Sequence, residues 1–188
     1  MGYFSEAGTF LIGVAFGLYI LLVMLRLVLQ TARADFRNPV SQFVYRATQP
    51  VLAPLRRVVP GWGGLDWALI LLLVVLQFLE LLLTNMITGQ TLHPLVLLVV
   101  ALGKLVKLLI TIYTVTIIVQ AILSWVQTGY HPVTALLWQI NEPVLRPFRN
   151  LLPAMGGLDL SPLLALVVLN LVSMAIPYLQ AALLRLLL

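Results

Sequence analysis

The strongest chemical signal in the sequence is a carboxylate inside a long apolar run. Glu80 lies deep within residues 67–87, which are mostly Leu, Ile, Val and Phe. A charged side chain inside a membrane span costs a few kcal/mol, so such residues usually bind an ion, relay a proton or pair with another charge. Gln77 lies three residues earlier and therefore on the same helical face. Asn170 has the position of Gln77 in a second copy of this region.

Two interpretations of Glu80 follow. With Gln77 and Asn170 it would form a cation or proton site inside the membrane. Alternatively, its carboxylate forms a structural ion pair with Lys104 or Lys107, or lies near enough to the outer interface to reach water. The two lysines share a helix face of their own, where they would bind a substrate anion, extend to the interface or pair with Glu80.

A second group of charges lies in two proline-rich segments between apolar runs. Arg56, Arg57 and Arg149 each have prolines close by. The planar guanidinium group binds phosphate and carboxylate through two parallel hydrogen bonds, which suits contact with a cytoplasmic protein or anionic lipid headgroups. The other interpretation is that these arginines only orient the chain, because basic loops stay in the cytoplasm.

The sequence lacks the residue patterns of catalytic and cofactor sites. Ser124, Ser161 and Ser173 have no neighbouring base and no G-x-S-x-G motif. There is no P-loop and no H-E-x-x-H motif, and His93 and His131 have no spacing that suggests a metal site. The absence of cysteine excludes disulfides and cysteine-ligated metals. We therefore expect that the protein is not an enzyme and that it binds no cofactor and no metal ion.

The elements that carry the arginines are duplicated. Residues 39–66 read PVSQFVYRATQPVLAPLRRVVPGWGGLD, and residues 132–159 read PVTALLWQINEPVLRPFRNLLPAMGGLD, an offset of 93 without a gap. The motif positions of the first copy are Asn38, Pro39, Pro50, Pro54, Arg56, Pro60, Gly64 and Asp66. Those of the second copy are Pro132, Pro143, Pro147, Arg149, Pro153, Gly157 and Asp159. The duplication predicts two tandem structural repeats.

The composition indicates an integral membrane protein. The chain is 62% hydrophobic and only 9% charged, whereas soluble domains have about 25% charged residues. We expect four spans, at about 7–29, 67–87, 108–126 and 161–180, because a hydrocarbon core of ~30 Å needs about 20 apolar residues. The net charge of +5 comes largely from the loops, so it indicates lipid phosphates and membrane orientation rather than nucleic acid.

The two polar loops are expected to be partly helical. The first, residues 31–65, predicts a short amphipathic helix at 39–48 that lies in the membrane interface. Asn38 is the expected N-cap of this helix and Asp66 that of the following span. The prolines after residue 48 are expected to prevent regular helix. The second loop, residues 127–160, repeats this layout.

The connection between the repeats allows two topologies. Residues 95–126 are too long for one untilted span, and two lysines interrupt them. We expect 92–107 to be a re-entrant or interfacial connector between repeats at 1–91 and 108–188. Both repeats then have the same orientation, with both basic loops in the cytoplasm. If 92–103 crosses the membrane instead, the repeats are inverted, as in many transporters.

The repeated pattern resembles the YggT/YlmG family of small bacterial and plastid membrane proteins. The resemblance rests on the proline, arginine, glycine and aspartate positions quoted above and extends over nearly the whole chain. The second copy departs from the pattern at His131 and at Asn150, which stands where the first copy has Arg57. The resemblance implies an inner-membrane or thylakoid protein linked to osmotic or ionic stress, to division, or to cytochrome maturation. It implies no catalytic residue.

We therefore expect an all-α membrane protein with two tandem repeats and about four transmembrane helices. Its expected function is that of a non-enzymatic scaffold or assembly and homeostasis factor of the bacterial inner membrane. The expected partners are anionic lipid headgroups and another membrane or cytoplasmic protein, or a second copy of the chain. The alternative function is a small oligomeric ion or osmolyte transporter that uses Glu80.

Overall fold

The computed structural model describes residues 2–126, 132–151 and 159–187, which fold into helices joined by short connections. In chain order these are α1 (Tyr3–Thr31), α2 (Pro39–Val58), α3 (Trp67–Thr88), α4 (Pro94–Val126), α5 (Pro132–Leu151) and α6 (Ser161–Leu187). Four of them, α1, α3, α4 and α6, are long and apolar enough to cross a membrane. The expected all-α membrane fold with four spans is confirmed.

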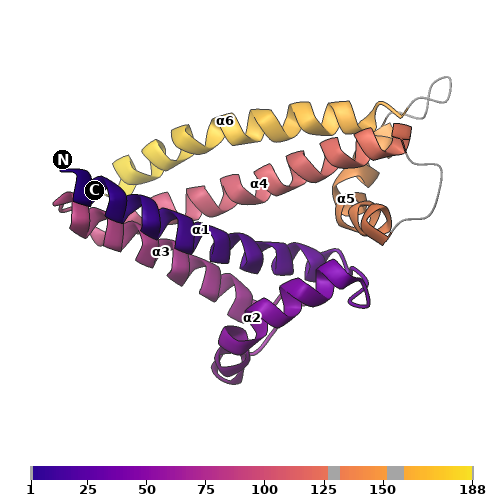
Figure 1. Cartoon of the computed structure of the whole chain (residues 1–188). Helices are drawn as coiled ribbons and strands as arrows, with labels where there is room; N and C mark the ends of the chain where they lie inside the picture. The colour runs from indigo at the N-terminus through magenta and orange to yellow at the C-terminus, as the bar shows by residue number, and fades with distance from the viewer. Residues whose placement is uncertain (1, 127–131, 152–158, 188) are drawn as a thin grey trace.

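Each repeat is a pair of long helices with an amphipathic helix at one end. α1 packs against α3, and α4 packs against α6. α2 and α5 both lie at one end of the bundle, whereas the two termini lie at the other (Figure 1). An offset of 93 places α1, α2 and α3 on α4, α5 and α6. The repeats therefore run in the same direction, and the inverted topology is wrong.

The expected connector between the repeats is not a separate element. Residues 94–107 form the first part of α4, which is one helix of 33 residues rather than a span at 108–126. Gly103 lies within this helix, and its missing side chain leaves room for the amide of Gln180 on α6. That amide donates to the carbonyl oxygen of Val99 at 3.0 Å. The second repeat thus begins with the whole of α4, as the first begins with α1.

The amphipathic helices are longer than the segment at 39–48 that we expected. α2 and α5 each have 20 residues and contain two internal prolines, Pro50 and Pro54 in α2 and Pro143 and Pro147 in α5. The expectation that these prolines prevent helix is wrong. All four lie on the exposed side of their helix. The carbonyl groups that lose a backbone donor therefore face outward, where water or lipid headgroups can hydrogen-bond them.

The expected helix caps are confirmed. Asn38 accepts a hydrogen bond from the backbone N–H two residues on, at 3.0 Å, and Asp66 accepts one from the N–H three residues on, at 3.3 Å. The turn between Pro60 and Asp66 needs glycine, since Gly64 has a φ of +78°. The corresponding positions of the second repeat, Pro153 and Gly157, lie outside the described residues.

The two repeats share one core and are joined at the α2–α5 end. The main hydrophobic cluster contains residues of α1, α3, α4 and α5. Asn38 donates to the carbonyl oxygen of Pro132 at 2.8 Å, and the backbone N–H of Asp35 donates to the amide oxygen of Gln139 at 2.9 Å. The connection before α2 therefore contacts α5, and α2 and α5 lie at the same end of the bundle; we call these two helices together the platform.

Candidate functional site

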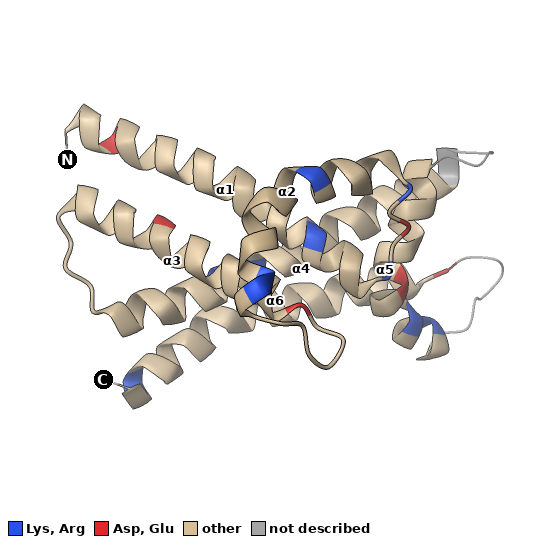
Figure 2. Ribbon diagram, turned by 90° about the horizontal axis from the view of Figure 1, so that it is seen from below, with Lys and Arg blue, Asp and Glu red and all other residues tan. Residues whose placement is uncertain are grey.

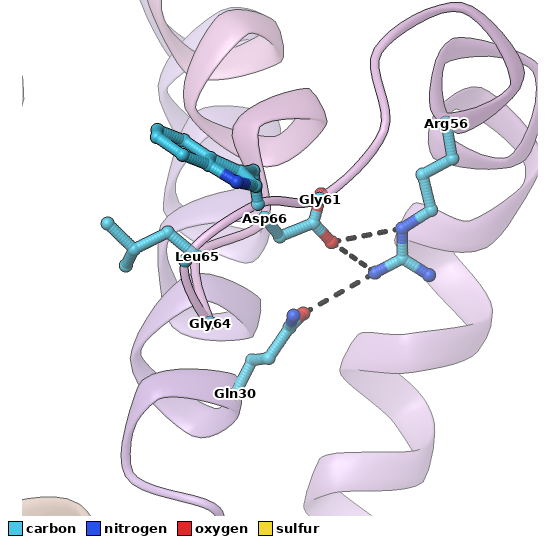
Figure 3. Close-up of a pocket in the computed structure, with 8 residues that line it drawn as sticks. Gln30, Arg56, Gly61, Gly64, Leu65 and Asp66 are labelled. Carbon is cyan, nitrogen blue, oxygen red and sulfur yellow. Dashed lines mark hydrogen bonds and ion pairs between the residues drawn. The ribbon is translucent and has the colours of Figure 1, made fainter.

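The first candidate site lies where α2 ends and α3 begins (Figure 3). Arg56 donates from Nε and Nη2 to Oδ2 of Asp66, with an Nε–Oδ2 distance of 3.0 Å. Its Nη2 also donates to Oε1 of Gln30 on α1 at 3.4 Å. The Asp66 side chain is 6% exposed, so its charge depends on this partner. These residues and the turn at 61–65 line an open pocket of about 570 Å³.

The same ion pair recurs in the second repeat. Arg149 donates from Nε to Oδ2 of Asp159 at 3.2 Å and from Nη1 to Oε2 of Glu142 at 2.6 Å. Its guanidinium carbon lies 4.9 Å from the ring centroid of Trp138. Asp159 also accepts hydrogen bonds from the backbone and hydroxyl of Ser161 at the start of α6. We call the two pairs the Arg–Asp clamps, because each joins the end of a platform helix to the start of the next span.

The contacts of the second clamp set the charge of its carboxylate. Partial burial raises the pKa of Asp159, but the hydrogen bonds from Ser161 and the charge and hydrogen bond of Arg149 lower it by more. The net pKa lies below the ordinary value of an aspartate. Asp159 is therefore ionised at neutral pH and available to Arg149.

The arginines that we expected to contact a partner or lipid differ in their availability. Arg56 and Arg149 use their guanidinium groups within the chain. Arg57 is exposed and forms no ion pair with any described residue. The clamps were missed by the sequence analysis although both copies keep Arg and Asp at the same spacing, as in Arg56 and Asp66. Both ion pairs could have been predicted from the sequence, because opposite charges that keep the same spacing in two copies indicate contact.

A second cluster, which no motif indicated, surrounds Arg26 on α1. Arg26 is 1% exposed. Its Nη1 donates to Oγ1 of Thr48 at 2.7 Å and to the carbonyl oxygen of Tyr45 at 3.3 Å, and its Nη2 donates to Oε1 of Gln49 at 2.7 Å. The ring of Tyr45 lies 4.5 Å from the guanidinium carbon. All these partners belong to α2 and none is a carboxylate, so a buried cation attaches α2 to α1 through neutral acceptors.

In the second repeat, neutral side chains attach the platform helix α5 to the span α4. Asn141 on α5 is fully buried. It donates to Oε1 of Gln120 and accepts from Oγ1 of Thr116, each at 2.7 Å. Val119 stands at the position of Arg26. The two repeats thus use a charged cluster and an amide cluster for the same attachment.

The candidate intramembrane residues do not form one site. Gln77, Glu80 and Lys104 meet where α3 packs against α4. Nζ of Lys104 lies 3.2 Å from both carboxylate oxygens of Glu80, and Oε2 of Glu80 also accepts a hydrogen bond from the Gln77 amide. Lys107 is exposed and forms no ion pair with the described residues. Asn170 lies on α6, where its amide donates to its own helix at 3.0 Å. The geometry matches the ion-pair interpretation of Glu80, and the expected group of Gln77, Glu80 and Asn170 is not formed.

The polar groups described above are binding and positioning groups. No group of three or more His, Asp or Glu residues among the described residues could hold a metal ion. The polar side chains that meet are ion pairs and amide networks between helices. Their chemical role in the structure is to fix α2 and α5 on the spans and to join α3 to α4.

Comparison with known proteins identifies the family. A model of the CCB3/YggT family matches twice, over residues 5–87 and 99–180, once for each repeat. An uncharacterised protein of Pseudomonas aeruginosa is 42% identical over 175 residues, which cover 92% of this chain and 89% of that protein. The protein YggT of Escherichia coli K12 is 39% identical over 168 residues, 89% of this chain and 88% of that protein.

A plastid relative matches over a shorter stretch. YlmG homolog protein 2, chloroplastic, of Arabidopsis thaliana is 40% identical over 61 residues, which cover 32% of this chain and 24% of that protein. No solved structure matches. The resemblance expected from the duplicated motif is confirmed by the double match of the family model and by the full-length bacterial relatives. The chain is a member of the CCB3/YggT family.

Proposed function

We propose that the chain is a non-enzymatic scaffold or assembly and homeostasis factor of the bacterial inner membrane, whose platform faces the cytoplasm. The observation that carries this proposal is the attachment of both platform helices to the spans at the same end of the bundle. Each helix is held twice, by an Arg–Asp clamp and by a buried polar cluster around Arg26 or Asn141. A surface fixed in advance loses little entropy when a partner binds, which suits a docking function.

The distribution of charge supports a cytoplasmic platform. Figure 2 shows the basic residues gathered mainly over α2, α5 and their connections, with one close to the C-terminus. The residues at the platform end are Arg33, Arg37, Arg46, Arg56, Arg57, Arg146 and Arg149. Loops rich in lysine and arginine remain on the cytoplasmic side of the inner membrane.

The platform has two kinds of group available for contact. Phe43 is 62% exposed and Val58 79% exposed, so α2 has an apolar side that can lie against the membrane interface. Arg57 remains free for a carboxylate of a partner protein or for a lipid phosphate. The proposed partner is therefore another membrane or cytoplasmic protein that approaches the platform at the membrane surface.

The alternative, an ion or osmolyte transporter, has less support. The carboxylate of Glu80 already has Lys104 and Gln77 as partners. A permeant cation would have to displace the lysine, and the breaking of a partly buried ion pair is costly. Asn170, which could have completed a coordination site, lies on another helix.

Photo-cross-linking in living cells tests the scaffold. A photoreactive amino acid replaces Arg57 on the platform, and in a matched control it replaces Gln90 at the opposite end of the bundle. We expect a reproducible cross-linked protein of defined mass from position 57 and none from position 90. Absence of any product at 57, together with an ion flux in liposomes that Glu80→Gln abolishes, would instead support the transporter.

A further inference from the structure

The second repeat contains an elongated groove of about 920 Å³ between α4, α5 and α6. Its walls are mainly apolar and include Ala121 from α4 and Leu163 and Leu171 from α6. Arg149 and Asp159, the members of the second Arg–Asp clamp, lie at its platform end. The volume lies within the ~300–1,000 Å³ of sites that bind small organic molecules.

The corresponding region of the first repeat is packed. Val28, Leu69 and Leu73 are only 1%, 0% and 3% exposed. Their counterparts at an offset of 93 are only partly buried and line the groove: Ala121, Pro162 and Leu166. The helix arrangement that both repeats share therefore does not by itself leave a groove. An unfilled apolar space destabilises a protein in proportion to its volume, which favours an occupant in the second repeat.

The length and position of the groove match one leaflet of a bilayer. Asp159 precedes α6, and Leu171 lies twelve positions further along the chain. At a rise of 1.5 Å per residue this distance is roughly 18 Å, slightly more than half of a hydrocarbon core of ~30 Å. The charged end lies at the platform, and the other end, lined mainly by apolar side chains together with Asn170, lies inside the membrane. This is the polarity of a phospholipid.

The polar end carries charges of both signs. The guanidinium of Arg149 lies between the carboxylates of Asp159 and Glu142, so a headgroup with negative charge alone would meet two carboxylates. Phosphoethanolamine carries a phosphate and an ammonium group and therefore complements both signs. The hydrogen bonds of Arg149 to the described residues use Nε and Nη1, which leaves Nη2 for a phosphate oxygen. Trp138, stacked beside Arg149, is a residue type that prefers the headgroup region.

We propose that this groove binds a phospholipid with a phosphoethanolamine headgroup as a structural ligand. An acyl chain lies between α4 and α6, and the headgroup lies at Arg149 and Asp159. The proposal does not depend on the scaffold function. It gives the second repeat a binding site in a place where the first repeat has a packed core.

The proposal is tested by the lipids that the purified chain retains. The wild type is purified in a mild detergent, and its bound lipids are extracted and quantified by mass spectrometry. We expect phosphatidylethanolamine in a stoichiometric amount. After delipidation, added phosphatidylethanolamine should raise the thermal unfolding temperature more than added phosphatidylglycerol does, because a ligand stabilises the folded state to which it binds.

Two substitutions on α4 make the test specific to the groove. Ala121→Phe fills the groove and should abolish both lipid retention and the gain in thermal stability. Val115→Phe is the matched control, because Val115 is 52% exposed and does not line the groove. It should retain lipid as the wild type does. Ala121→Leu is a milder filling variant and keeps the test valid if the phenylalanine prevents folding.

Three results would overturn the proposal. Equal lipid content in the wild type and both filling variants would mean that the lipid co-purifies nonspecifically and not through the groove. Preferential retention of phosphatidylglycerol would contradict the headgroup assignment. A dimer in native mass spectrometry that Ala121→Phe dissociates would show that a second copy of the chain fills the groove.

Discussion

Arg26 and Glu80 are both charged, and both lie within helices that are long enough to cross a membrane. Arg26 satisfies its donors with neutral acceptors on α2, whereas Glu80 has a lysine of opposite charge on α4. The first arrangement fixes a platform helix on its span. The second joins the two repeats. In each case the charge is tolerated because its partners lie within hydrogen-bond distance.

Replacement of the buried arginine should destabilise the chain. Arg26→Ala removes three hydrogen bonds and leaves the oxygens of Thr48 and Gln49 without this donor. Each buried polar group left unsatisfied costs roughly 1–3 kcal/mol. We expect a marked fall in the thermal unfolding temperature in detergent micelles. Arg46→Ala is the control, since Arg46 is an exposed arginine on α2, and it should change the unfolding free energy by less than about 0.5 kcal/mol.

The pair between Glu80 and Lys104 is best tested with a double-mutant cycle. Glu80→Gln leaves Lys104 unpaired and should lower the yield of folded protein. The double variant Glu80→Gln/Lys104→Gln replaces the ion pair by two amides and should recover much of that loss. Purification yield and thermal unfolding are the measurements. A single Glu80→Gln variant that folds as well as the wild type would contradict a structural role for the pair.

At the scale of elements, the sequence predicts the spans and caps better than the helices that contain proline. The spans follow from apolar length, and the caps follow from Asn38 and Asp66. The extent of α2 could not be predicted, because the prolines are tolerated only on the exposed side of the helix, and that side is set by tertiary packing. The fit of Gln180 against Gly103 could not be predicted either, because it is a contact between residues that are distant in the sequence. The groove depends on a difference in packing between two similar repeats, which a sequence pattern does not record.

The first Arg–Asp clamp offers a comparison between neighbouring arginines. Arg56→Lys removes the two-pronged contact with Asp66, whereas Arg57→Lys changes an exposed residue that forms no ion pair within the described part of the chain. We expect a loss of stability for the first substitution, in the range of ~1–3 kcal/mol for hydrogen bonds to a charged group. The second should leave stability unchanged. The measurement is the thermal unfolding temperature of both variants under the same conditions. Equal unfolding temperatures would show that the clamp does not stabilise the fold.

The second clamp should give a pH dependence at low pH. The pKa of Asp159 in the folded chain lies below its ordinary value, because the hydrogen bonds from Ser161 and the charge of Arg149 outweigh the effect of burial. The stabilisation is therefore complete above the unfolded pKa of about 3.9 and is lost as the pH falls through the folded pKa. We expect the difference in unfolding temperature between the wild type and Asp159→Asn to be constant from pH 7 to about pH 5 and to shrink below about pH 4.

At the scale of the whole molecule, the parallel repeats place two similar surfaces on one side of the membrane. The platform helices lie at the same end of the bundle, and the connection from α3 to α4 lies at the opposite end with the termini (Figure 1). The chain can therefore present two non-identical copies of the same motif to a partner on one face. The opposite face carries the N-terminus, the C-terminus and a short link.

Labelling with an impermeant thiol reagent in intact cells tests this orientation. The chain has no cysteine, so single substitutions are sufficient. Gln90→Cys should be labelled, whereas Arg57→Cys and Asn150→Cys should be protected until the membrane is permeabilised. Labelling of both platform cysteines in intact cells would place the platform outside. Labelling of only one of them would contradict parallel repeats.

The pair that joins the repeats also has a consequence for biosynthesis. Glu80 precedes Lys104 by 24 residues, so α3 emerges from the ribosome before its counter-charge does. Until α4 follows, the carboxylate has only Gln77 as a partner, and its burial in lipid costs a few kcal/mol. The stable insertion of the first repeat is thus coupled to the arrival of the second. A nascent chain that stops between the repeats carries in its second span an acid without its lysine partner.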